Sequence, residues 1–148
     1  MSIRLEMRAE PGLLRADAAG EFSLEEAKRT FLEILEAVAK HKTKKVLFDG
    51  RALMGEPETL ERFLYGEFVA KSVVEFEDRG VSRATKFAYV LEQPMLDPRR
   101  FGETVAVNRG MLVEIFDNLD GALRWLRAES ANKTDAGGPQ RFEPDPKQ

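Results

Sequence analysis

Residues 97–126 constrain the fold more than any other stretch, because the limits of two helices and a strand can be placed there almost residue by residue. Asp97 is a favourable N-cap, and Pro98 suits the first helical position, where its missing N–H costs no hydrogen bond. A helix is therefore predicted to begin at this point. Gly110 is predicted to end it, because a glycine just past the last turn adopts the left-handed conformation that allows the final carbonyls to be capped.

The end of the same stretch predicts a strand followed by a second helix. MLVEIF is apolar and β-branched but too short for an independent helix, and Asp117 is predicted to cap the helix LDGALRWL. The stretch therefore predicts the order helix, strand, helix. It contains no catalytic or cofactor motif.

The remaining elements follow from spacing and turn chemistry. The alternating apolar residues from Ile3, interrupted by the turn at 10–12, predict an N-terminal β-hairpin. Ser23 and Glu26 have capping-box spacing and predict the start of an amphipathic helix. Further elements are predicted as a strand at 46–48, a loop at 51–57, a long helix at 58–77 and a strand at 85–91. Strands separated by helices favour an α/β fold with a mainly parallel or mixed sheet.

Composition bounds the class of protein. The 148 residues are 43% hydrophobic, a length and content that predict one domain over residues 1–128, followed by a flexible polar tail at 129–148. The chain has no cysteine, which excludes disulfides and thiolate metal sites, and no metal or cofactor is expected. A net charge of -3 argues against nucleic-acid binding. We expect a cytoplasmic protein, because the sequence has neither a signal peptide nor a transmembrane segment.

The order of elements and three segments, FAYV, RFGETVAVNRG and VEIFDNLDGALRWL, resemble the SpoIIAA-like proteins of the STAS and SEC14-like superfamily. The resemblance covers residues 3–127. It implies a four- or five-stranded mixed sheet with the N-terminal hairpin, covered by about four helices. It also implies a bacterial regulatory or ligand-binding domain, frequently self-associated, rather than an enzyme.

Phosphorylatable STAS proteins carry a serine after the central strand, at the start of the next helix. The corresponding segment here is 49–55, DGRALMG, which has no serine or threonine. Thr59 is the nearest hydroxyl and falls inside the predicted long helix. The resemblance therefore implies a member that does not use the usual phosphorylation switch.

Two pairs of residues are candidate sites for a ligand or a partner. Asp49 and Arg51 follow the predicted central strand, where ligands of open α/β sheets bind, so Arg51 could hold an anion or simply pair with Asp49. Arg99 and Arg100 fall in the first turn of the predicted helix, where an anion is favoured. Pairing with Glu103 within the helix is the structural alternative.

The long predicted helix has apolar residues on more than one face. Tyr65 and Phe68 could therefore line an apolar pocket, form a homodimer interface along residues 57–78, or belong to the core. The leading hypothesis is a non-enzymatic regulatory or protein-interaction module, homodimeric through this helix. The alternative is a SEC14-like binder of a lipid or another apolar small molecule.

Overall fold

The computed structural model describes residues 2–128, which form one five-stranded sheet with helices on both faces. The strands lie in the order β1-β2-β3-β4-β5; β1 and β2 are antiparallel, and every later pair is parallel. The strands are β1 Ile3–Glu10, β2 Leu13–Glu21, β3 Lys45–Met54, β4 Lys86–Val90 and β5 Leu112–Phe116. The helices are α1 Leu24–His41, α2 Thr59–Glu75, α3 Phe101–Asn108 and α4 Leu119–Arg127, with a short 3-10 helix at Phe76–Arg79.

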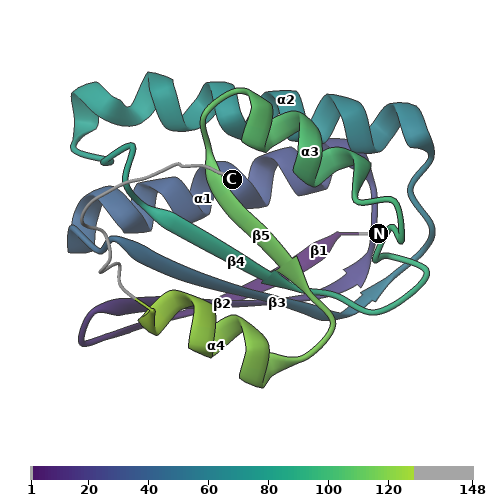
Figure 1. Cartoon of the computed structure of the whole chain (residues 1–148), viewed down its shortest axis with the longest axis horizontal. Helices are drawn as coiled ribbons and strands as arrows, with labels where there is room; N and C mark the ends of the chain where they lie inside the picture. Colours follow the sequence, from purple (N-terminus) through teal and green to yellow (C-terminus); the bar gives the residue numbers. More distant parts are fainter. Residues whose placement is uncertain (1, 129–148) are drawn as a thin grey trace, which may run out of the picture.

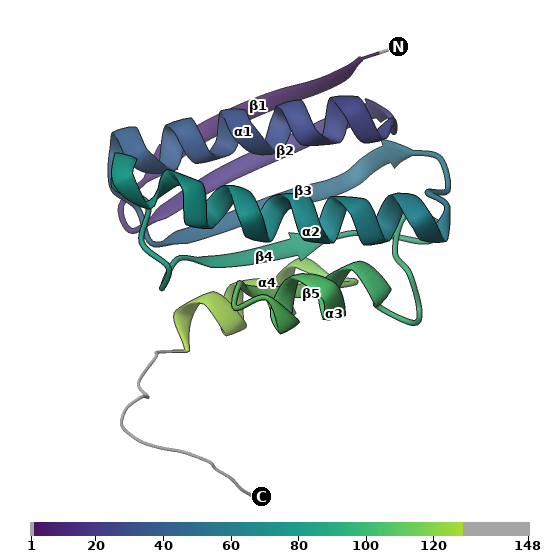
Figure 2. The same ribbon diagram turned by 90° about the horizontal axis from the view of Figure 1, so that it is seen from above.

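Helices α1, α2 and α3 lie side by side on one face of the sheet, and α4 lies on the other (Figure 1, Figure 2). The predicted α/β fold is therefore confirmed: a mixed five-stranded sheet with an N-terminal hairpin and four α-helices. The predicted polar tail at residues 129–148 lies outside the described residues. No helix in the described part is long and apolar enough to cross a bilayer.

The hairpin and α1 form where the sequence predicts them. Gly12 turns the chain with a φ of 74°, and the Ser23 hydroxyl accepts a hydrogen bond from the Glu26 backbone N–H at 3.2 Å. The second half of the predicted capping box differs, because the Glu26 carboxylate accepts from the backbone N–H of Ile3. Glu26 thereby ties α1 to the first strand.

The central strand is longer than predicted, and this changes the position of a candidate site. Only 46–48 was expected as strand, with a loop from 51, whereas β3 runs from Lys45 to Met54. The apolar run marks the part of β3 that is buried between both helical layers. After Asp49, β3 no longer pairs with β4 but continues beside β2, with a bulge near Gly50. Asp49 and Arg51 therefore lie within the strand, not after it.

The predicted start of one helix and the predicted N-cap of another are wrong, although the second helix begins at Leu119 as predicted. The helix expected from Asp97 begins at Phe101, because Asp97 caps a turn whose backbone N–H donors belong to Arg99 and Phe101. Arg100 lies just before the helix in a left-handed conformation with a φ of 54°. For α4 the N-cap is Asn118 rather than Asp117, since the Asn118 side chain accepts from the Gly121 N–H at 2.7 Å.

The sheet separates two apolar cores of unequal size. The larger core lies under α1, α2 and α3 and includes Phe31, Phe87 and Tyr89. The smaller one lies between α4 and strands β3 and β4, around Leu47 and Leu126. Because α4 packs on β3, β4 and β5, the same face of β1 and β2 carries no helix within residues 2–128.

Candidate functional site

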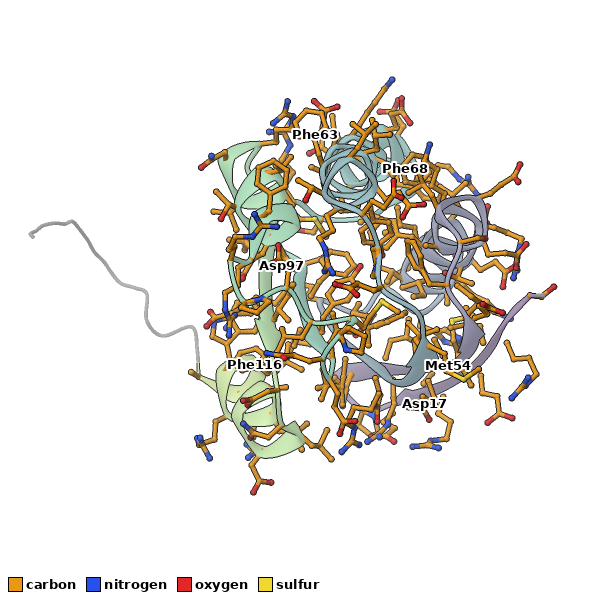
Figure 3. The ribbon with its side chains drawn as sticks, turned by 90° about the vertical axis from the view of Figure 1, so that its right-hand side faces the viewer. Asp17, Met54, Phe63, Phe68, Asp97 and Phe116 are labelled. Carbon is orange, nitrogen blue, oxygen red and sulfur yellow. The ribbon has the colours of Figure 1, made fainter. Side chains whose placement is uncertain are left out.

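A cavity of about 110 Å³ lies inside the larger core, between the sheet and helices α2 and α3. It is at the carboxyl ends of the parallel strands, the edge at which open α/β sheets bind ligands. Residues at or just past four strand ends form one side of it: Phe22, Leu53, Leu91 and Ile115. Residues of α2 and α3, with Ala27 and Thr30 of α1, form the other side. Asp97, at the rim, lies between α3 and the sheet (Figure 3).

Two tyrosines meet in this cavity. The hydroxyl oxygens of Tyr65 on α2 and Tyr89 on β4 are 2.7 Å apart, and their rings are nearly perpendicular. Burial raises the pKa of both hydroxyls well above the ordinary value of 10.0, and for Tyr89 the neighbouring Tyr65 raises it further. Both side chains are therefore uncharged at neutral pH and available for hydrogen bonding.

The charged residues of the lining are engaged with backbone or with one another. Arg62 donates to the carbonyls of Met95 at 2.8 Å and Pro94 at 3.1 Å, which fixes the loop after β4 to α2. Glu103 accepts from the Ile115 N–H at 3.3 Å, and Arg100 donates to the Ile115 carbonyl. These two side chains of the α3 segment satisfy backbone groups of the edge strand β5.

Asp97 also satisfies backbone groups, in the turn just before α3. Burial alone would raise the pKa of its carboxyl group, but hydrogen bonds from the N–H groups of Phe101 and Arg99, with the nearby arginines, hold it below the ordinary value. Asp97 is therefore ionised at neutral pH and organises the turn that leads into α3.

Two glycines allow α2 and α3 to close over the cavity. A Cβ atom on Gly66 would lie 2.6 Å from the carbonyl oxygen of Gly102, and one on Gly102 would lie 3.0 Å from the carbonyl oxygen of Arg62. The two helix backbones therefore touch at this crossing, which only residues without side chains permit.

The structure places Asp49 and Arg51 away from this cavity. Asp49 accepts from the Arg51 guanidinium at 2.7 and 3.0 Å and from Arg15 at 3.1 Å. These bonds, the one to Arg51 foremost, lower the pKa of Asp49. Asp17, its neighbour on β2, projects from the sheet face opposite α1 and α2 (Figure 3). The structure therefore shows Arg51 paired with Asp49, which was the alternative to binding an anion.

The other predicted site residues are also separated. Arg100 lines the cavity, but Arg99 points toward Thr59, at 3.3 Å, and Asp97, at 3.6 Å. The expectation that both arginines share the first turn of a helix is wrong, since the helix begins only at Phe101. Pairing with Glu103 occurs for Arg100, at 3.2 Å.

Tyr65 and Phe68 belong to different surroundings. Tyr65 lines the cavity, whereas Phe68 lies on the side of α2 that faces α1 (Figure 3). Phe68 is partly buried against the larger core, and the Lys28 ammonium is 5.3 Å from its ring centroid. Of the six predicted site residues, the structure brings together only Tyr65 and Arg100 at the cavity.

Sequence reasoning missed the partner of Tyr65. Tyr89 lies in the buried run FAYV, and a tyrosine that faces a core needs a hydrogen-bond partner for its hydroxyl. This requirement for a partner is the feature of the sequence that could have indicated the Tyr65–Tyr89 pair. Phe48, Leu91 and Met95 were missed as lining residues because nothing local distinguishes them from ordinary core residues. Within residues 2–128, no group of acidic or histidine side chains could hold a metal ion.

Comparison with known proteins locates the fold. No family model and no curated protein sequence matches the chain. Among solved structures, the chain is similar to an anti-sigma factor antagonist from Mycobacterium paratuberculosis, with a TM-score of 0.57 and 17% identity over 85% of this chain and 95% of the other. A protein with a SpoIIAA-like fold from Shewanella loihica matches at a TM-score of 0.49 and 17% identity, over 84% and 94% of the two chains. With its hairpin, mixed sheet and four helices, the chain has the fold of the anti-sigma factor antagonist.

Proposed function

We propose that this chain is a non-enzymatic regulatory module that binds a protein partner and does so without a phosphorylation switch in residues 49–55. The observation that carries the proposal is the fold shared with an anti-sigma factor antagonist, over 85% of the chain. The segment 49–55 lacks serine and threonine. Its first residues are held in β3 by the pairing with β2 and by the Asp49–Arg51 ion pair.

The proposed contact for the partner is Arg51 on the open face of the sheet. Asp49 holds its guanidinium in a fixed orientation, and the same face of β1 and β2 is not covered by a helix in the described residues. An oriented arginine on an open polar face is typical of protein interfaces.

The test is affinity capture with the full chain as bait, followed by binding measurements with each purified protein that is retained. Arg51→Ala should weaken the complex by about tenfold, a typical loss at an interface arginine. Arg83→Ala is the matched control, because Arg83 is also exposed and ion-paired but lies before β4. Equal binding by both variants would remove Arg51 from the site. If no retained protein binds the purified chain, the proposal fails.

A homodimer along residues 57–78 is part of this proposal. Leu60 and Val74 on α2 are 63% and 41% exposed, and a dimer along this helix would cover them. Sedimentation analysis at micromolar concentration should give a dimer for the natural chain and a monomer for the Leu60→Glu, Val74→Glu variant. Met54→Glu, at a side chain 61% exposed on β3, is the control. A monomeric natural chain would contradict the dimer.

The second candidate function is the binding of an apolar small molecule. The cavity between α2, α3 and the sheet favours it, because its lining is largely apolar and it lies at the ligand-binding edge of the sheet. Its volume of about 110 Å³ favours a compact molecule over a lipid. Native mass spectrometry of freshly purified protein should then show a bound species of low mass.

A further inference from the structure

The cavity under α2 and α3 has the size of one small ring. An apolar cavity of about 150 Å³ holds a benzene molecule, and sites for drug-sized ligands begin at about 300 Å³. The cavity here measures about 110 Å³. The enclosed volume is therefore comparable to that of one unsubstituted five- or six-membered ring.

The lining selects an uncharged and preferably aromatic occupant. The rings of Phe48 and Tyr89 lie 4.8 Å apart at one wall, and Tyr65 stands nearly perpendicular to Tyr89. The charged or hydroxyl-bearing side chains around them already have protein partners: Glu61, Arg62, Asp97, Arg100, Glu103 and Thr30. A charged ligand would therefore meet no charged side chain in this lining that lacks a protein partner.

The tyrosine pair retains one hydrogen-bond donor. Two hydroxyl groups carry two protons, and the single bond between Tyr65 and Tyr89 uses one of them. Within residues 2–128, neither hydroxyl has another protein partner, so the second proton has no protein acceptor. A buried donor without an acceptor favours any occupant that supplies one.

We propose that this cavity is a binding site for a small, uncharged ring compound with one hydrogen-bond-accepting oxygen or nitrogen atom, which receives the free hydroxyl proton of the Tyr65–Tyr89 pair. The inference rests on the second candidate function and adds the chemistry by which the ligand is recognised. It is independent of the protein partner and of the dimer.

The test uses two probes of matched shape, benzene and pyridine, at a pH where pyridine is uncharged. The readout is NMR of the full chain with labelled tyrosine, because Tyr65 and Tyr89 are the only tyrosines of the sequence and give two signals. Pyridine should shift both tyrosine signals in a saturable way. The double variant Tyr65→Phe, Tyr89→Phe keeps the rings and removes both hydroxyls, and its binding is followed through the signals of bound probe.

The measured quantity is the ratio of pyridine to benzene affinity. In the double variant this ratio should fall about fivefold, the value of one hydrogen bond, while benzene affinity is retained or increased. An unchanged ratio would overturn the inference but leave the cavity as a site for apolar molecules. Failure of both probes to bind the natural chain would overturn the second candidate function as well. Urea unfolding of the double variant checks that it is folded. If it is not, the natural chain alone decides, because pyridine must shift the labelled Cζ signals of both tyrosines more than benzene does, and equal shifts would overturn the inference.

Discussion

The hydroxyl groups of Tyr65 and Tyr89 lie 2.7 Å apart in the larger core, although one residue comes from a helix and the other from the neighbouring strand layer. This bond joins α2 to β4 under the cavity. It places the two tyrosines of the chain in one low-dielectric environment. The alkaline titration of tyrosine in this protein therefore reports on that environment.

We expect neither tyrosine to ionise near pH 10 in the folded chain, because burial raises the pKa of both. Above pH 10 the unfolded chain releases protons that the folded chain retains, so the free energy of unfolding should fall as pH rises further. Tyrosinate absorbance and circular dichroism, followed together, should change in one transition. A rise in tyrosinate absorbance near pH 10 with the fold intact would contradict the burial of the pair.

The Tyr65–Tyr89 pair also shows which features of the fold could not be predicted from the sequence. FAYV identifies a buried strand, and the long helix is evident from the absence of breakers, but α2 is apolar on several faces. Its rotation about its own axis is fixed by the close contact of Gly66 with Gly102, which is a long-range contact without a local signal. That rotation directs Tyr65 into the cavity and Phe68 toward α1.

The predicted ends of β3 and the predicted start of α3 were wrong for a related reason. Hydrophobic periodicity reports burial, so it marked residues 46–48 and missed the half of β3 that has one neighbouring strand and an open face. Near Asp97 the capping signal was correct in kind, because Asp97 does accept backbone N–H groups, but the first of them belongs to a turn. Short-range signals thus specified the interactions and not the length of the element.

The second prediction concerns Asp97, which is 6% exposed and accepts two backbone N–H bonds. Asp97→Asn should lower the free energy of unfolding at pH 7 by about 1–2 kcal/mol, because the amide oxygen replaces only part of this hydrogen bonding. Since its pKa is lowered in the folded chain, the stabilisation is complete above the ordinary value of 3.8 and is lost as pH falls through the folded pKa. Urea unfolding of both proteins from pH 7 to pH 3 should show the difference shrinking. A constant difference would contradict the ionised state of Asp97.

The third prediction tests the contact between α2 and α3. Gly66→Ala should destabilise the chain by about 1–3 kcal/mol, because the new Cβ would lie 2.6 Å from the Gly102 carbonyl oxygen and force the helices apart. The control is Gly121→Ala in α4, where the nearest atoms are side-chain atoms at 3.3 Å. There the gain in helix propensity should offset the contact. Thermal unfolding distinguishes the two variants, and equal effects would mean that the helix crossing is not tight.

The fourth prediction uses a buried hydroxyl without a partner. Thr85 is 1% exposed just before β4, and its Oγ1 has no hydrogen-bond partner in the described part of the chain. Thr85→Val keeps the shape and removes the unsatisfied group, so the free energy of unfolding should rise by about 1 kcal/mol. Thr30→Val is the matched control, because the equally buried Thr30 hydroxyl donates to the Ala27 carbonyl at 2.9 Å, and its loss should not stabilise the chain. Urea unfolding of the two variants should therefore give shifts of different sign. A destabilised Thr85→Val protein would show that this hydroxyl has a partner in solution, such as a buried water.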